Sequence, residues 1–582
     1  MSKSRRFIKL VAYLRPHWRD TTLGIIALLV VNGLGAYIPL LIRGCVDQLS
    51  ESFNYEQILR YGILIVLLSS SMWLMRMASR IWIFGVGRQV EFDLKQRIFE
   101  HLLKLEPSYF ATNTAGDLIS RATSDVDNIR RLLGFVVLSF ANTIFAYALT
   151  LPVMLAINVN LTILALLPYP LMFFMVLVFS ERLRNQQTAV QQNISDASDL
   201  IQEDISGISL IKIYAQEDSE RRAFDRENQK LLQANLKLAR TQNTLFPLIG
   251  GLANVSSLII IWIGASQIGS NLDVGDFLAL LVYVGRLVFP TALLGFTITA
   301  YQRGEVSVDR VESIFSVEPK IKDYSDAIHL SREAVKGELS AKNLTFTYPG
   351  SETPALDNIN FSIFPGETIA IVGSIGSGKS TLANCLPRLL DIDEGELFLD
   401  GVDITKIALT DLRDAIAYVP QDSFLFSSTI QNNIRYGDPL AEQQEVETAA
   451  ELAQISSEIT NFPQKYNTVV GERGITLSGG QRQRTSLARA MLVDAPVLIL
   501  DDALSSVDNQ TATQILKNLS GGSKRKTVVF ITHQLSAAAA ADRIFVMEKG
   551  KIVQIGNQIE LLQQPGLYKT LWSQHYVEEL LH

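Results

Sequence analysis

The chain has 582 residues, of which 48% are hydrophobic and only 19% are charged. This length predicts several domains, and the apolar composition is unusual for a soluble chain and indicates membrane spans. The net charge of −7 gives no reason to expect nucleic acid as a partner. The two cysteines, Cys45 and Cys385, are far apart and lack metal-ligand spacing, so they do not indicate a disulfide framework or a cysteine metal site.

Residues 1–20 form a basic, amphipathic N-terminal segment. Between positions 4 and 18, Lys and Arg are mixed with apolar side chains, which is typical of a helix lying on the inner membrane surface. The alternative is a tail that only improves solubility. Because no small-residue cleavage site follows the apolar stretch, we expect the segment to be retained.

Long apolar stretches follow between residues 21 and 302. They cover 21–42, 61–87, 132–180, 241–272 and 277–302. A span needs about 20 residues. The stretch 132–180 has no Asp, Glu, Lys or Arg and is long enough for two helices with a turn at 158–160. We therefore predict a six-helix transmembrane domain over 21–302.

Basic residues predict the orientation of these spans. Segments 44–59, 157–160 and 269–276 have no Lys or Arg, whereas 88–131 and 181–240 are rich in them. Loops rich in Lys and Arg remain on the cytoplasmic side. We therefore expect a protein integral to the cell (inner) membrane, with both termini in the cytoplasm.

The two basic segments are too long to be turns, so they predict helices that extend into the cytoplasm. Breaks are expected at 106–108, around Gly116 and near Gly207. A short transverse helix at such a break would be well placed to contact a cytoplasmic domain.

The composition changes after residue 302, because no later segment could span a bilayer. We interpret 303–336 as a linker and 337–582 as a soluble α/β domain that lies in the cytoplasm. Two short apolar runs, 368–372 and 497–500, predict central parallel strands that are covered on both faces.

A glycine-rich loop directly follows the first of these strands and precedes an apolar helical pattern. It consists of Gly373, Ser374, Ile375, Gly376, Ser377, Gly378, Lys379, Ser380 and Thr381. The glycines let backbone N–H groups surround a phosphate, Lys379 reaches the β- and γ-phosphates, and Ser380 binds Mg²⁺. The motif predicts an ATP and Mg²⁺ site, and the expected fold class is a membrane α-helical bundle fused to an α/β P-loop ATPase domain.

Two further motifs lie in the same domain. Strand 497–500 is followed by Asp501, an acidic residue expected to organise Mg²⁺ beside the phosphate loop. The signature Leu477-Ser478-Gly479-Gly480-Gln481 precedes a helical stretch over 482–492, and its amides make a second anion site. One domain cannot easily use both phosphate sites on one nucleotide.

These motifs, in this order and followed by 503–508 and His533, resemble the ATP-binding cassette family. With six spans before the cassette, the chain is similar to that family's exporters over nearly its whole length. The resemblance implies that two cassettes pack head to tail. Ser478, Gly479, Gly480 and Gln481 of one cassette would then contact the ATP on the phosphate loop of the other.

The resemblance also implies roles for four residues outside these loops. Tyr348 matches the aromatic residue that stacks on adenine, and Gln421 matches the glutamine that contacts Mg²⁺ and water. Glu472 matches an exporter-type contact to the coupling helices, and His533 matches the histidine that contacts the γ-phosphate. Taken singly, each has a simpler interpretation: a surface aromatic, two solvated loop residues and a packed core histidine.

Asp502 departs from the family pattern. Members that hydrolyse ATP efficiently carry Glu at this position, directly after the Asp that organises Mg²⁺. The Asp carboxylate is shorter by one methylene, about 1.5 Å, and a general base must reach the attacking water. We therefore expect slow hydrolysis at this chain's own site.

Because the signature is intact, we expect a heterodimer with an unlike half-transporter that has the Glu and an altered signature. The rival interpretation is a homodimer in which Asp502 still acts as the base.

Together these features predict ATP-dependent export of a small amphipathic substrate, such as a drug, lipid or short peptide, across the lipid bilayer. Arg286, midway along the sixth span, is expected to line a central cavity; the alternatives are pairing with a backbone carbonyl and snorkelling to the membrane interface. Asn32, Asn142 and Asn254 are candidates for hydrogen bonds between helices. The alternative function is an ATP-gated channel or regulatory subunit that does not pump.

Overall fold

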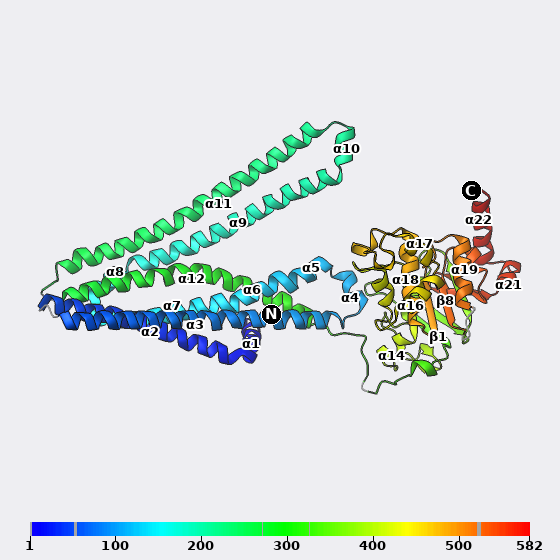
Figure 1. The fold of residues 1–582 in the computed structure, drawn as a ribbon, viewed down its shortest axis with the longest axis horizontal. Helices are drawn as coiled ribbons and strands as arrows, with labels where there is room; N and C mark the ends of the chain where they lie inside the picture. Colours follow the sequence, from blue (N-terminus) through cyan, green and yellow to red (C-terminus); the bar gives the residue numbers. More distant parts are fainter. Residues whose placement is uncertain (1–2, 52–54, 270–271, 325, 521–524, 582) are drawn as a thin grey trace. The chain divides into compact units, whose positions relative to one another are not determined.

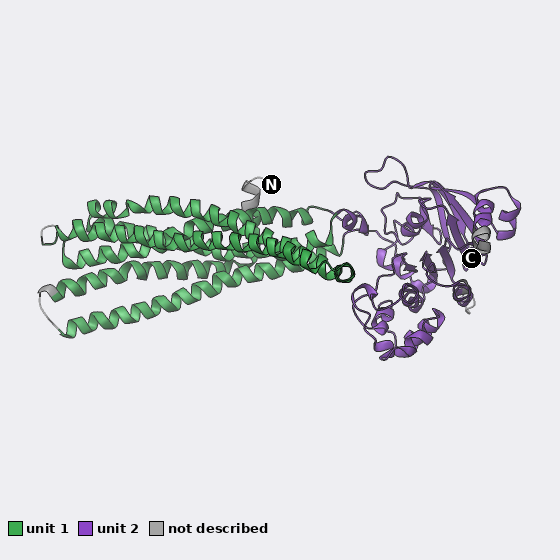
Figure 2. Cartoon of the chain, turned by 90° about the horizontal axis from the view of Figure 1, so that it is seen from above, with its two compact units in different colours: residues 1–104, 113–317 green, residues 105–112, 318–582 purple. Residues whose placement is uncertain are grey.

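The computed structural model of the chain (Figure 1) describes residues 3–51, 55–269, 272–324, 326–520 and 525–581. The chain forms two compact units, which Figure 2 colours separately. Unit 1 comprises residues 1–104 and 113–317, and unit 2 comprises residues 105–112 and 318–582.

Unit 1 is built from long helices. They are α2 (Trp18–Glu51), α3 (Tyr55–Leu102), α7 (Val137–Ile157), α9 (Pro168–Ser206), α11 (Glu217–Ile259) and α12 (Val274–Phe315). Shorter segments extend them: α5 (Ala115–Ser120), α6 (Val126–Arg131), α8 (Val159–Leu166) and π-helical turns at Arg121–Asp125, Leu132–Val136 and Ile260–Gly264. Six helical stretches are long and apolar enough to cross a membrane, which confirms the predicted number of spans.

Short breaks separate helices where the sequence predicted them. Helix α7 ends at Ile157, and Asn158 caps α8 because its side chain accepts a hydrogen bond from the Leu161 N–H at 3.0 Å. The short helix α4 (Pro107–Thr112) begins at the predicted proline, and α10 (Ile208–Ile213) directly follows Gly207 and joins α9 to α11. The break expected around Gly116 lies just before α5, where Thr114 is the N-cap.

The N-terminal helix α1 (Lys3–Leu14) packs against the helices of unit 1. Its Leu10 and Tyr13 are buried in a cluster with residues of α3 and α12. The Tyr13 hydroxyl donates to Glu312 of α12, and the Lys9 Nζ lies 2.8 Å from the same carboxylate. One face of this basic helix is therefore held by protein, a contact that its composition alone did not predict.

Arg286 of α12 makes the backbone contact that the sequence offered as one alternative, and it also lines a cavity. Its guanidinium donates to the Asn32 carbonyl oxygen at 3.2 Å, and Asn32 donates to Asn142 at 3.1 Å, which joins α2, α7 and α12. Arg76 and Arg80 line the same cavity of about 460 Å³. Two of the three predicted asparagines thus take part in one network between helices.

Unit 2 contains two sheets. The four-stranded sheet has the order β2-β1-β4-β5, and the six-stranded sheet has the order β10-β9-β3-β8-β7-β6. The strands are β1 (Leu339–Phe346), β2 (Leu356–Ile363), β3 (Thr368–Gly373), β4 (Leu397–Leu399), β5 (Val402–Asp403), β6 (Ile416–Val419), β7 (Val497–Asp501), β8 (Thr527–Ile531), β9 (Arg543–Glu548) and β10 (Lys551–Gly556). The predicted strands 368–372 and 497–500 are β3 and β7, which are buried along their whole length.

The six-stranded sheet packs against helices on one face and against the four-stranded sheet and α13 on the other, and alternate residues of β3 enter different hydrophobic clusters. Ala370 and Val372 belong to one cluster, whereas Ile369 and Ile371 belong to the other. The helices are α13 (Lys379–Cys385), α14 (Leu409–Asp414), α15 (Ile430–Arg435), α16 (Gln443–Leu452), α17 (Ser456–Asn461), α18 (Gly479–Val493), α19 (Asn509–Ser520), α20 (Leu535–Ala538), α21 (Gln558–Gln563) and α22 (Leu567–Leu581). Both faces of the sheet are therefore filled, as the predicted α/β class requires.

Candidate functional site

The glycine-rich loop begins at the carboxyl end of β3, in the interior of the parallel sheet. The φ angle of Gly378 is +97°, and a Cβ there would lie 2.6 Å from the Ala355 carbonyl oxygen. A Cβ on Gly373 would lie 2.2 Å from the Met547 carbonyl oxygen. The glycines therefore allow a left-handed turn and a close backbone approach that a side chain would prevent.

Lys379 is the first residue of α13, and its side chain is buried. Its Nζ donates to the carbonyl oxygens of Gly373 and Ser374 at 2.9 and 2.8 Å. Burial lowers the pKa of the Lys379 ammonium, while the carboxylates of Asp502 and Asp501 oppose this shift. The backbone of the loop therefore surrounds the Lys379 ammonium, which can bind phosphate oxygens there.

Ser380 and Asp501 lie together, as a shared Mg²⁺ site requires. The Ser380 Oγ donates to Asp501 Oδ1 at 2.9 Å. The Tyr418 hydroxyl donates to Asn384 Oδ1 at 2.8 Å, and its oxygen lies 3.3 Å from Asp501 Oδ2. Burial raises the pKa of Asp501. Among the described residues, no group of three or more His, Cys, Asp and Glu side chains is placed to hold a metal ion. A hydroxyl and a carboxylate nevertheless fit Mg²⁺, which usually takes few protein oxygens and completes its shell with water and phosphate.

The register of the parallel strands brings three predicted catalytic residues to one edge of the sheet. Val419 of β6 pairs with Leu500 of β7, and Asp501 of β7 pairs with Ile531 of β8. Gln421, Asp502 and His533 follow these strand ends within two residues. His533 also lines a cavity of about 160 Å³ together with Gly373 at the start of the phosphate loop.

Asp502 has an unusual backbone and carboxylate environment. Its φ is +49°, in the left-handed region where Asp is tolerated better than most residues. Its Oδ1 is buried and has no hydrogen-bond partner among the described residues. Burial raises the pKa of Asp502, while His533 acts in the opposite direction. These are properties of a carboxyl group that could accept a proton, but the side chain is short.

Tyr348 lies beside the phosphate loop, where an adenine ring could stack. Its hydroxyl is 3.2 Å from Thr381 Oγ1, and its ring meets Phe346 edge to face with centroids 5.0 Å apart. The side chain is 41% exposed, so one face of the ring remains accessible.

The signature residues form the start of α18. The Ser478 Oγ accepts from the Gln481 N–H at 3.2 Å, while the Gln481 side chain accepts from the Ser478 N–H at 2.9 Å. A Cβ on Gly480 would lie 2.8 Å from the Ser506 carbonyl oxygen. Among the described residues, no hydrogen bond joins the signature to the phosphate loop of the same chain. Glu472 is exposed in a separate 3₁₀ turn, Glu472–Gly474.

Sequence reasoning missed Gln483, which joins the signature helix to the segment after β7. Its side chain is buried, its Nε2 donates to Ser505 Oγ at 3.0 Å, and its Oε1 accepts from the Ser506 N–H at 2.9 Å. Tyr418 was missed as well. No local sequence pattern marks either residue, and the hydrogen-bond partners of both become visible only in the folded chain.

Replacing Gln483 by leucine should lower the turnover number for ATP by about tenfold and leave the KM for ATP nearly unchanged. The substitution removes the side-chain bonds to Ser505 Oγ and to the Ser506 N–H, and so loosens the segment that carries Asp502. Steady-state ATPase kinetics would test this. Gln444→Leu, at an exposed position on α16, is the matched control and should behave as the wild type. An equal loss in both variants would contradict a specific role for Gln483.

Two family descriptions match separate parts of the chain. Residues 21–291 match a family described as "ABC transporter transmembrane region", and residues 356–505 match one described as "ABC transporter". "Multidrug resistance-like ATP-binding protein MdlA" from Escherichia coli (strain K12) is 35% identical over 581 residues, covering 99% of this chain and 98% of that protein. An "ATP-dependent lipid A-core flippase" from Syntrophus aciditrophicus (strain SB) is 33% identical, covering 98% of this chain and 95% of that protein.

A solved structure is similar over almost the whole chain. The structure of a bacterial Atm1-family ABC exporter with ATP bound has a TM-score of 0.75 and 25% sequence identity, covering 98% of this chain and 99% of that chain. The fold class expected from the sequence, a six-helix membrane bundle fused to a nucleotide-binding domain, is confirmed.

Proposed function

Because this chain belongs to the ABC transporter family and is an exporter half-transporter with an ATPase domain, we propose that it exports an amphipathic drug, lipid or short peptide by alternating access. The observation that carries the proposal is the presence of a phosphate loop and a separate signature loop in one domain, fused to six spans. Since these loops are not joined within one chain, each would complete an ATP site with a second cassette.

The residues at the sheet edge suggest how this chain would handle ATP. The loop from Gly373 to Thr381 would hold the phosphates, with Lys379 supplying the positive charge. Ser380, Asp501 and Gln421 would hold Mg²⁺, which supplies charge neutralisation on the phosphates. Asp502 would orient the attacking water, His533 would contact the γ-phosphate, and Tyr348 would stack on adenine.

We further propose a heterodimer in which this chain has the slower ATP site. Asp502 supports the proposal because its carboxylate is short, while the intact Ser478 to Gln481 could complete a faster site on the partner's ATP. The competing arrangement is a homodimer in which Asp502 acts as the base. Slow ATP turnover by the purified chain alone, accelerated by an unlike partner, would support the heterodimer.

The membrane orientation is part of the same proposal. The distribution of Lys and Arg supports placing both termini and the domain 337–582 in the cytoplasm, joined through the linker 303–336, with the spans in the inner membrane. Motion of the cassettes would reach the spans through the short helices α4 and α10.

Transport in sealed proteoliposomes tests the function. With ATP on the cassette side, an amphipathic substrate should accumulate against its gradient, and the ATPase rate should rise when the substrate is added. A non-hydrolysable ATP analogue is the control and should give no accumulation. Ion current without accumulation would instead identify the ATP-gated channel or regulatory subunit.

A further inference from the structure

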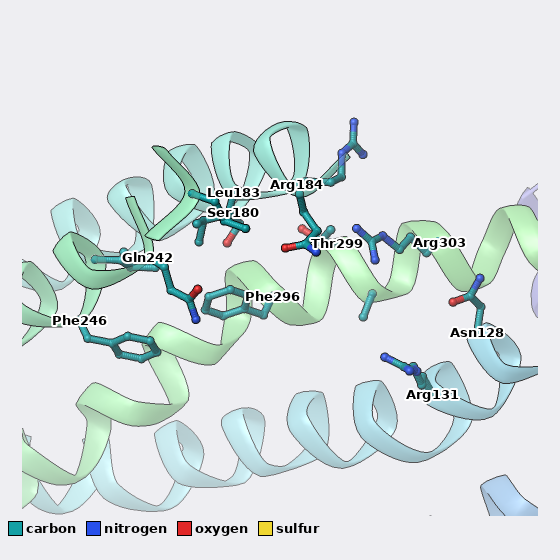
Figure 3. Close-up of a pocket in the computed structure, with 14 residues that line it drawn as sticks. Asn128, Arg131, Ser180, Leu183, Arg184, Gln242, Phe246, Phe296, Thr299 and Arg303 are labelled. Carbon is teal, nitrogen blue, oxygen red and sulfur yellow. The ribbon is translucent and has the colours of Figure 1, made fainter. Parts of the chain in front are cut away.

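A cavity of about 440 Å³ lies within unit 1, between α6, α9, α11 and α12 (Figure 3). It is separate from the cavity that contains Arg286, because the two share no lining residue. Its position suggests a ligand site, and what it would bind depends on the side chains that line it.

Three arginines give the cavity its charge. Arg131, Arg184 and Arg303 line it from α6, α9 and α12, and all three side chains are exposed to solvent (Figure 3). The fourteen lining residues include no Asp or Glu. Arg131 pairs with Asp127 at 2.7 Å, whereas the side chains of Arg184 and Arg303 have no ion-pair partner among the described residues. Guanidinium groups repel one another unless an anion is bound between them.

The remaining wall is largely apolar. Its apolar members are Leu183, Leu238, Leu245, Phe246 and Phe296. Ser180 also lines the cavity, and its buried hydroxyl, on a side chain only 5% exposed, has no hydrogen-bond partner. A polar atom buried without a partner favours a ligand that can supply one.

The cavity has a polar end and an apolar end along the helices. A Cβ on Gly295 would lie 2.5 Å from Val176, so α9 and α12 are in close contact at that level. Arg184 and Arg303 lie further along the two helices, beyond the apolar runs that end at 180 and 302. This places the arginines where the apolar spans end and charged helix begins, the level at which a lipid presents its head group.

We propose that this cavity binds an amphipathic organic anion, with a phosphate or carboxylate head on Arg184 and Arg303 and an apolar tail against Phe246 and Phe296. Arginine binds such heads through paired, charge-assisted hydrogen bonds. Lipophilic cations are disfavoured by the positive charges of Arg184 and Arg303, which have no ion-pair partner among the described residues. The inference deepens the proposed export function, on which it rests, by assigning the charge of the substrate.

Equilibrium binding to the purified full-length chain in phosphatidylcholine nanodiscs, without ATP, would test the assignment. Dodecyl phosphate should bind, while dodecyltrimethylammonium of the same chain length should bind much more weakly. The double variant Arg184→Gln/Arg303→Gln should bind dodecyl phosphate about 10- to 100-fold less tightly. The matched control is Arg221→Gln on α11, whose side chain is 79% exposed and outside the cavity, and it should bind as the wild type.

Equal binding of the two probes, or unchanged binding by the double variant, would overturn the assignment. Displacement of dodecyl phosphate by a similar concentration of inorganic phosphate would also overturn it, because the apolar wall would then contribute nothing. A thermal unfolding midpoint of the double variant equal to that of Arg221→Gln shows that it is folded. Failure of the export proposal looks different: dodecyl phosphate would bind as expected but would not accumulate in the vesicle assay.

Discussion

Replacing Lys379 by alanine should lower ATP turnover by about 100- to 1000-fold and greatly weaken ATP binding. Lys379 is the only cationic side chain in the described phosphate loop. Its Nζ donates hydrogen bonds to the carbonyl oxygens of Gly373 and Ser374. Its removal takes away the charge that would stabilise the transferred phosphoryl group. Phosphate release and binding of a fluorescent ATP analogue would measure the two effects.

The matched control is Lys517→Ala, which removes an exposed lysine from α19 of the same unit. It should leave both ATP binding and turnover at wild-type values. If Lys379→Ala bound and hydrolysed ATP normally, the nucleotide would have to bind somewhere other than the loop at the end of β3.

Replacing Asp502 by glutamate should raise hydrolysis at this chain's own site, by up to about a hundredfold if the length of the side chain limits the rate. The added methylene lengthens the side chain by about 1.5 Å, which extends the reach of the carboxylate toward the attacking water. The phosphate release rate of the purified variant, compared with that of the wild type, is the measurement. No increase would mean that Asp502 is not limiting and would favour the homodimer.

Asp502→Asn provides the control, because it keeps the size of the side chain and removes the proton acceptor. Its turnover should fall below that of the wild type.

The pH dependence of ATP hydrolysis gives a second check. Burial raises the pKa of Asp502, and only the ionised form accepts a proton, so wild-type own-site hydrolysis should increase as the pH rises through this raised pKa. The asparagine variant should lack that dependence.

The sequence predicted features that depend on local patterns. The six spans follow from apolar runs, and the breaks at Pro107, Asn158 and Gly207 follow from residues that end or cap helices. Strands β3 and β7 were recognisable because buried parallel strands are short and continuously apolar.

Other features depend on tertiary contacts and were out of reach. Nothing in the sequence near Tyr13 indicates that its hydroxyl meets Glu312, since the two residues are 299 positions apart. The cavity lined by Arg131, Arg184 and Arg303 could not be predicted for the same reason. These arginines belong to three spans, and the apolar pattern does not specify how the spans pack. The roles of Tyr418 and Gln483 likewise follow from neighbouring strands and loops brought together by the sheet.

The hydrogen bonds of Gln483 have a consequence for the energy use of the transporter. They connect a helix that would serve the partner's ATP with the segment holding Asp502, which would serve this chain's own ATP. Through this connection, events at one nucleotide would be transmitted to the other without passing through the spans. In a pair with one slow and one fast site, the slow nucleotide could then stay bound over several cycles. The number of ATP molecules hydrolysed per transported substrate molecule would then approach one. It would be two if both sites hydrolysed ATP in every cycle.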